Sequence, residues 1–267
     1  MMRTELSEKS KGSKVTTEET PSVTQVDDRV YSKPHGQVAA FRFDDRVARC
    51  FDDMIRRSVP GYDLSLQSIA TLTRRYFQPG STVVDLGASL GASTLALIEG
   101  ISGRPGCVLA IDNSESMVER LRLNLSGYDG LDIAVRHSDI METEIKDASV
   151  VVVNYTLQFI DPRDRLALMK RIHDGLRPGG ILILSEKVTF EDAEEEDLLT
   201  EWHHDFKRDN GYSDLEIEQK RAAIENVLIP DSVSSHRERL LRSGFERVVV
   251  WSQAFRFASL VAIRSCN

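Results

Sequence analysis

The chain has 267 residues, 41% of them hydrophobic, and a formal net charge of −8. A chain of this length and composition can bury one sizeable α/β core. Asp and Glu outnumber Lys and Arg by 42 to 34, which argues against stable nucleic-acid binding, because phosphate contacts need clustered cations. Cys50, Cys107 and Cys266 show no C-x-x-C spacing and fit a reducing cytoplasm, and no apolar run is long enough to span a membrane.

The first part of the chain differs in composition from the rest. Residues 1–38 are rich in Ser, Thr, Glu and Lys and hold a single aromatic residue. Such a segment buries too little apolar surface to fold alone, so we expect a disordered tail there and an ordered α/β domain over 39–267. A first helix is expected from about 41 to 55, and a second one follows the S-V-P-G-Y turn and ends before Pro79.

The segment T-V-V-D-L-G-A-S-L-G-A-S (82–93) is the most informative of the chain. An apolar strand, an acidic residue, a glycine-rich loop and a helix start indicate a nucleotide-type ligand at the carboxyl end of a parallel strand. The pattern D-x-G-x-x-x-G differs from the dinucleotide motif G-x-G-x-x-G. It is typical of enzymes that bind S-adenosyl-L-methionine (SAM), whose amino-acid end carries no phosphate. A tight strand–helix turn that binds nothing is the plain alternative.

Further polar residues stand at the ends of later strand-like segments. C-V-L-A-I-D-N contains Asp112, whose carboxylate can accept both hydroxyls of a ribose. Asp139 and Ile140 follow the next such segment, within reach of an adenine amino group, and A-S-V-V-V-V-N ends in Asn154. Each residue alone is more often a helix cap or part of a solvated turn. Strand-end polar residues in this order together predict a SAM site.

From Thr82 to Glu186 strands alternate with helices, which indicates a doubly wound, Rossmann-like sheet. The charged segment of about 190–230 is expected to be a helical insertion after the fifth strand, lying over the carboxyl edge of the sheet as a cover or a dimerisation element. A helix over 233–243 and two last strands close a mostly parallel, seven-stranded sheet. The expected fold class is therefore the α/β SAM-methyltransferase fold.

On these segments the sequence resembles the carboxy-S-adenosyl-L-methionine synthase family, within the class I SAM-dependent methyltransferase superfamily. The resemblance covers about 43–263. Its distinctive strings are M-I-R-R-S-V-P-G-Y (54–62), D-L-G-A-S-L-G-A (85–92), N-Y-T-L-Q-F (154–159), L-S-E-K (184–187) and H-H-D-F-K-R-D-N-G-Y-S (203–213). It implies a homodimer that converts SAM and prephenate to carboxy-SAM and phenylpyruvate. A separate tRNA carboxymethyltransferase then uses carboxy-SAM on 5-hydroxyuridine at the wobble position.

The resemblance also implies which residues contact the ligand. They are Tyr62, Gly87, Ala88, Ser89, Asp112, Asn113, Asp139, Ile140, Asn154 and Arg221. Ala88 stands where many relatives have Cys, and because the contact there is expected to involve the backbone, the difference should matter little. The N-terminal extension has no counterpart in the resemblance.

Carboxylation of the SAM methyl group needs a base and carbon dioxide, and no protein general base is evident. The resemblance implies that prephenate supplies both, because its decarboxylation and aromatisation release carbon dioxide and hydroxide. Arg221 and Tyr62 are expected to position the substrate carboxylate, by a bidentate ion pair and a hydrogen bond respectively. The plain alternatives are that Arg221 pairs with Glu218 or Glu225 on a solvated helix face, and that Tyr62 packs under its turn.

No metal is expected. His203 and His204 are adjacent, so they point to different sides of a helix, and neither has a partner ligand at i+4. The N-Y that begins at Asn154 lacks the prolines of N-P-P-Y, which argues against amino-group methylation of nucleic acid. Two other functions stay open: a conventional small-molecule SAM methyltransferase acting on a carboxylate, and a non-catalytic SAM-binding partner of a tRNA-modifying enzyme.

Overall fold

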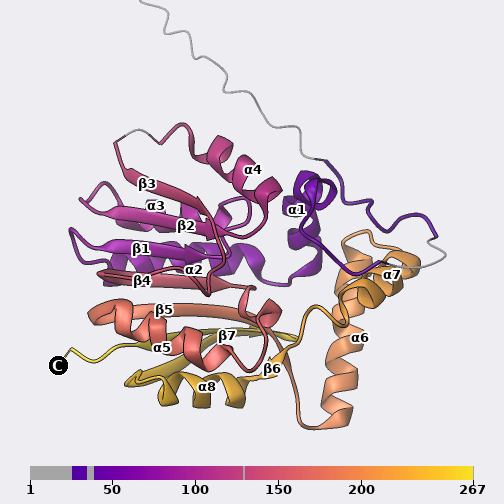
Figure 1. The fold of residues 1–267 in the computed structure, drawn as a ribbon. Coiled ribbons are helices and arrows are strands. Elements are labelled where there is room, and N and C mark those ends of the chain that lie inside the picture. Colours follow the sequence, from indigo (N-terminus) through magenta and orange to yellow (C-terminus); the bar gives the residue numbers. More distant parts are fainter. Residues whose placement is uncertain (1–25, 35–38, 129, 267) are drawn as a thin grey trace, which may run out of the picture.

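The computed structural model describes residues 26–34, 39–128 and 130–266, and Figure 1 shows their arrangement. The strands of the sheet are β1 (Thr82–Leu86), β2 (Cys107–Asp112), β3 (Asp132–His137), β4 (Ala148–Asn154), β5 (Leu176–Thr189), β6 (Asp231–Ser232), β7 (Arg247–Ala254) and β8 (Phe257–Ile263). The helices are α1 (Asp45–Ser58), α2 (Tyr62–Tyr76), α3 (Ala92–Ile101), α4 (Glu115–Leu125), the 3-10 helix η1 (Leu157–Phe159), α5 (Arg165–Gly175), α6 (Ala193–Asp209), α7 (Asp214–Ile224) and α8 (Val233–Arg242).

The strand order is β3-β2-β1-β4-β5-β8-β7, and the short β6 pairs with β5. The first five strands of this order pair in parallel, whereas β8 is antiparallel to both of its neighbours. The predicted mostly parallel, Rossmann-like sheet of seven strands is thereby confirmed, with the two-residue β6 as an addition.

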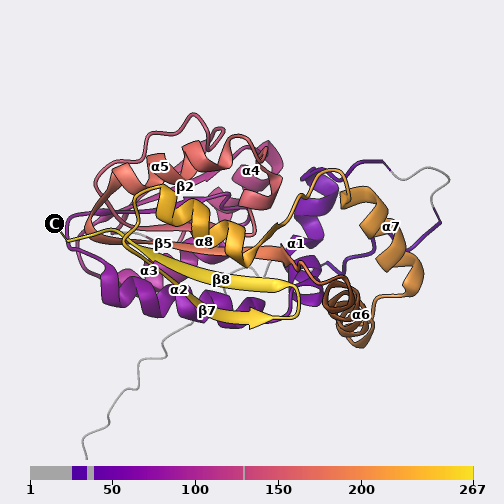
Figure 2. The ribbon, with the colours of Figure 1, turned by 90° about the horizontal axis from the view of Figure 1, so that it is seen from below.

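The central strand β4 explains how the core is organised. Its run A-S-V-V-V-V is buried at every residue, as expected for a parallel strand that is covered on both faces. Helices α2 and α3 cover one face of the sheet, and α5 and α8 cover the other (Figure 2). An apolar cluster lies between the sheet and each pair of helices. Val150 belongs to the cluster beneath α2 and α3 and Val151 to the cluster beneath α5 and α8, because successive side chains of a strand point to opposite faces.

Helices α1, α6 and α7 gather at one end of the sheet (Figure 1). The predicted insertion of about 190–230 consists of α6 and α7. Helix α6 begins where the Asp192 side chain accepts the N–H of Glu195. Helix α7 begins with a capping box between Ser213 and Glu216. None of the helices in the described part of the chain is long and apolar enough to cross a membrane.

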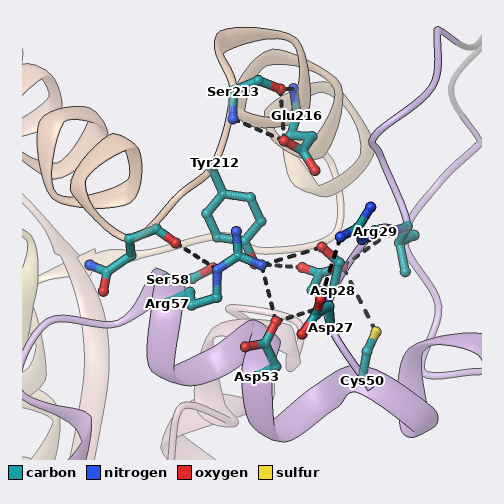
Figure 3. A network of polar contacts seen from close by, with 12 residues as sticks. Asp27, Asp28, Arg29, Cys50, Asp53, Arg57, Ser58, Tyr212, Ser213 and Glu216 are labelled. Atoms are coloured by element: carbon teal, nitrogen blue, oxygen red, sulfur yellow. Dashed lines mark hydrogen bonds and ion pairs between the residues drawn. The ribbon is translucent and has the colours of Figure 1, made fainter. Parts of the chain in front are cut away.

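The predicted disordered tail of residues 1–38 lies mostly outside the described residues. Its described part, 26–34, differs from that expectation, because it packs against α1 and α7. Asp28 is only 2% exposed and accepts a hydrogen bond from the Tyr212 hydroxyl at 2.5 Å (Figure 3). Tyr31 is buried in an apolar cluster with Phe41. A paired carboxylate and an aromatic ring thus anchor a segment whose average composition predicted disorder.

Candidate active site

A cavity of about 470 Å³ lies at the carboxyl ends of β1, β2 and β4, covered by α1, α6 and α7. Its volume is in the range of sites for small molecules and cofactors. All of the predicted contact residues except Arg221 line it, namely Tyr62, Gly87, Ala88, Ser89, Asp112, Asn113, Asp139, Ile140 and Asn154. The fold therefore brings together side chains from the ends of four strands and from the start of α2.

The glycine-rich loop after β1 closely approaches the loop after β4. Gly87 has φ +81°, and a Cβ atom added there would lie 2.2 Å from the Oγ1 of Thr156, so this position needs glycine. The N–H groups of Gly87 and Ala88 both donate to the carbonyl of Ile111, at 2.9 and 2.8 Å. These bonds hold the loop against β2 and leave the Ala88 N–H unavailable to a ligand.

Asp112 at the end of β2 is oriented by two backbone donors. Its Oδ2 accepts the N–H of Ser89 at 2.8 Å, and its Oδ1 accepts the N–H of Ser114 at 2.8 Å. Burial raises the pKa of this carboxyl, while the backbone hydrogen bonds act to lower it. Each oxygen keeps a further lone pair, so the carboxylate can accept two hydroxyls of a vicinal diol such as a ribose.

The turn after β3 is also fixed in place. Asp139 Oδ1 accepts the N–H of Met141 at 2.8 Å, and the Arg171 guanidinium on α5 binds the carbonyls of Ile140 and Met141. This turn borders the cavity beside the end of β2, because the N–H of Ser138 donates to the carbonyl of Asp112 at 3.0 Å. A planar base could therefore lie against it.

Asn154 at the end of β4 has one unsatisfied atom. Its Nδ2 donates to the Ser93 hydroxyl at 3.0 Å, but its buried Oδ1 has no hydrogen-bond partner within the described part of the chain. A buried acceptor without a donor is costly, so a ligand with an N–H group is favoured there. The ammonium group at the amino-acid end of SAM is such a donor, and the residues present therefore fit SAM.

The sequence did not predict the role of Glu186 on β5. This side chain is 0% exposed, and it accepts the N–H groups of Thr156, Leu157 and Gln158 at 2.7–3.1 Å. Burial raises the pKa of Glu186 to about 8, and the three backbone donors oppose this rise. The carboxyl group holds the start of η1, and with it the loop that follows Asn154, at the edge of the cavity.

Asp85, the acidic residue ahead of the glycine-rich loop, does not line the cavity. It is buried, and its Oδ2 accepts the Thr94 hydroxyl at 2.6 Å. Burial raises its pKa to about 7. The side chain therefore joins β1 to α3.

The part of the cavity near α6 combines aromatic rings with cations. The centroid of the Tyr155 ring lies 6.1 Å from the centroid of the Tyr62 ring and 6.0 Å from that of the Phe257 ring. Three lysines also line the cavity, namely Lys187, Lys207 and Lys220. Burial lowers the pKa of Lys187 and Lys220 to about 8 and that of Lys207 to about 7. Two of them stand within the quoted strings L-S-E-K and H-H-D-F-K-R, yet nothing in the sequence set them apart from solvated lysines.

Arg221 on α7 is exposed and lies outside the cavity of its own chain. Its positive charge contributes to lowering the pKa of Lys187 and of His204, so it is near the cationic side of the site. Within the described ranges no ion pair joins it to Glu218 or Glu225.

The two adjacent histidines have separate environments. His203 is buried, and its Nε2 lies 2.8 Å from the carbonyl of Ser58. Burial holds the pKa of His203 well below its usual range, so the neutral ring donates to this carbonyl. Over the stretches that the structure describes, no group of three or more His, Cys, Asp or Glu side chains could hold a metal ion.

Comparison with known proteins gives close relatives. A methyltransferase domain family matches residues 83–180. The carboxy-S-adenosyl-L-methionine synthase of Trichlorobacter lovleyi is 54% identical over 245 residues, which are 91% of this chain and 100% of the relative. The enzyme of the same name from Vibrio atlanticus is 52% identical over 238 residues, which are 89% of this chain and 98% of the relative.

Solved structures with a similar fold are more distant in sequence. The magnesium protoporphyrin IX methyltransferase of Synechocystis matches with a TM-score of 0.56 and 18% identity, over 79% of this chain and 87% of that one. Human N-acetylserotonin methyltransferase matches with a TM-score of 0.55 and 15% identity, over 83% and 57% of the two chains. These two likenesses show the methyltransferase fold.

Proposed function

The chain belongs to the carboxy-S-adenosyl-L-methionine synthase family, and from this premise we propose that it uses prephenate to convert SAM to carboxy-SAM, releasing phenylpyruvate. It is an enzyme whose substrate is SAM and whose product is carboxy-SAM. One observation carries the proposal for prephenate. A single cavity joins a SAM-type half, at Asp112 and Asn154, to a half with aromatic walls and lysines.

We assign the SAM contacts from the cavity lining. Asp112 accepts the ribose hydroxyls through its free lone pairs, and the turn at Asp139 and Ile140 borders the adenine. Asn154 Oδ1 accepts the ammonium group of the amino-acid end. The methyl group then lies between the glycine-rich loop and Tyr62, facing the aromatic half of the cavity.

The proposed reaction is balanced without a protein base. Prephenate loses carbon dioxide, and the electron pair of the broken bond completes the aromatic ring of phenylpyruvate while the ring hydroxyl leaves as hydroxide. Hydroxide takes a proton from the SAM methyl group and becomes water. The electron pair left on the methyl carbon forms the new bond to carbon dioxide. The protein holds the reactants in contact and excludes solvent.

Tyr62 and Arg221 are proposed to position a carboxylate. Burial raises the pKa of the Tyr62 hydroxyl, so it stays protonated and can donate a hydrogen bond. Arg221 is exposed and outside its own cavity, which supports a role in the cavity of a neighbouring subunit. The proposal therefore includes a homodimer, and it assigns the product to a separate tRNA carboxymethyltransferase. The cytoplasmic location that the cysteine pattern favours stays a prediction.

Mass spectrometry of small molecules after incubation of the purified protein with SAM and prephenate tests this function. The expected product is heavier than SAM by one carbon dioxide and appears together with phenylpyruvate, and its formation depends on prephenate. Release of S-adenosylhomocysteine with a methylated acceptor would instead indicate a conventional methyltransferase. Binding of SAM without any turnover by the purified protein would indicate a non-catalytic SAM-binding subunit.

A further inference from the structure

Two lysines of the cavity have no counter-ion in the part of the chain that the structure describes. Lys187 and Lys207 both line it, and neither has a carboxylate within ion-pair distance among the residues that the structure describes. Removing a cation from water without pairing it is costly, and such groups are rarely kept for stability alone. Burial is the largest cause that lowers the pKa of both lysines, and neighbouring positive charges lower it further. The charge of Glu196, which lies beyond ion-pair distance, partly opposes this for Lys187.

The fold holds both lysines toward the same space. Lys187 follows the buried Glu186 on β5 and is in register with Phe257 of β8. Lys207 stands one helical turn after His203 on α6, and therefore on the same face of the helix. The His203 ring is held by its hydrogen bond to the carbonyl of Ser58, and its centroid lies 5.0 Å from the centroid of the Phe257 ring. Long-range packing thus places the two cations beside one aromatic wall.

The third lysine of the cavity is different. Lys220 Nζ lies 3.0 Å from the Ser58 hydroxyl and 3.8 Å from Asp28 Oδ2. Asp28 in turn belongs to a network with Asp53 and Tyr212, and Figure 3 shows how these side chains meet. Lys220 is therefore neutralised by the protein, whereas Lys187 and Lys207 are left for a ligand.

We propose that Lys187 and Lys207 form the binding subsite for the carboxylates of the second substrate, a cyclic dicarboxylate whose ring packs against Tyr62, Tyr155 and Phe257. This deepens the proposed function and rests on it. Two ammonium groups pair with two carboxylates, and the aromatic walls accept a six-membered ring. The subsite also explains selectivity, because a monocarboxylate such as phenylpyruvate would leave one cation unpaired and be released after the reaction.

Calorimetric titration of prephenate into protein saturated with S-adenosylhomocysteine tests the subsite without turnover. Lys187→Met and Lys207→Met should each weaken prephenate binding by about 10- to 100-fold, the size expected for loss of a charged hydrogen bond. Both variants should bind S-adenosylhomocysteine as the wild type does. Lys170→Met, which removes an exposed lysine of α5, is the matched control and should leave prephenate binding unchanged.

The pH dependence of the same titration gives a second readout. Lys207 must be protonated to pair with a carboxylate, so wild-type affinity should fall as the pH rises past the Lys207 pKa of about 7. Lys207→Arg should keep the binding and lose the part of the fall that begins near pH 7, because a guanidinium stays charged, whereas the part that begins at the Lys187 pKa of about 8 should stay.

The outcomes separate the two proposals. If prephenate binds the wild type and both methionine variants equally, the subsite is overturned and the proposed function stands. If binding depends on the lysines but no carboxy-SAM forms, the subsite stands and prephenate is not the carboxyl donor. If the wild type does not bind prephenate at all, both are overturned.

Discussion

At the scale of single residues, Lys207 should favour substrate binding but reduce the stability of the folded chain. The pKa of a lysine in an unfolded chain is about 10.4. Burial lowers the pKa of Lys207 in the folded chain to about 7. Between these values the unfolded chain binds more protons, so the contribution of Lys207 to stability rises with pH and is least favourable below pH 7.

Replacement of this lysine should therefore stabilise the protein. For Lys207→Met we expect the free energy of unfolding near pH 6.5 to increase by about 0.5–2 kcal/mol, with a gain that shrinks toward pH 10. Urea denaturation at several pH values measures this change. Lys170→Met should show neither the gain nor its pH dependence. A loss of stability in Lys207→Met would instead indicate that the lysine supports the fold.

At the scale of elements, the loop between β1 and α3 shows why this motif needs its first glycine. Gly87 and Gly80 both have positive φ, at +81° and +77°. A Cβ at Gly87 would strike Thr156, whereas no atom of the described residues lies within 4 Å of a Cβ at Gly80. Gly80→Ala should therefore carry only the cost of a left-handed backbone, about 1–2 kcal/mol. Gly87→Ala carries the same cost and also displaces the loop that follows Asn154.

A comparison of these two variants isolates the contact between the loops. Gly87→Ala should weaken binding of S-adenosylhomocysteine by at least about tenfold, because Ser89 and Asn154 both move from their positions. Gly80→Ala should bind it as the wild type does. Calorimetry and thermal denaturation of both variants measure the two effects. Equal affinities in the two variants would show that the loop contact does not shape the site.

The elements also show how far the sequence could lead. The ends of β1, β2 and β4 were predictable, because an apolar run followed by Asp, Asn or Gly is a local signal. The cationic half of the cavity was not, since Lys187 and Lys207 meet only when α6 packs across the end of the sheet. Glu186 was missed for the same reason: its three partners are backbone N–H groups about 30 residues earlier in the chain.

At the scale of the whole molecule, the segment before α1 was the least predictable part. Residues 26–34 belong to the stretch of 1–38, for which the average composition predicts disorder. Asp28 is nevertheless held by Tyr212, which is 184 residues away in the chain, and by Lys220 of α7. The segment therefore joins α1 to the helical insertion, and it supplies a carboxylate, that of Asp28, which neutralises Lys220.

The dimer hypothesis makes a prediction that only the whole assembly can test. Arg221→Ala has an intact cavity but lacks the arginine, whereas Asp112→Ala has a damaged SAM site and an intact Arg221. Each variant alone should form little carboxy-SAM at limiting SAM. If Arg221 acts across the subunit interface, a mixed dimer contains one complete site.

Random exchange of equal amounts gives mixed dimers in half of the population, so about a quarter of the sites are complete and about a quarter of wild-type activity should return. Unfolding and refolding the two variants together, with each refolded alone as a control, provides this exchange. No recovery in dimers of confirmed mixed composition would place Arg221 in its own subunit's site or outside catalysis. Recovery of activity would show that Arg221, which is exposed on α7 of a single chain, completes the active site of a second copy of the chain.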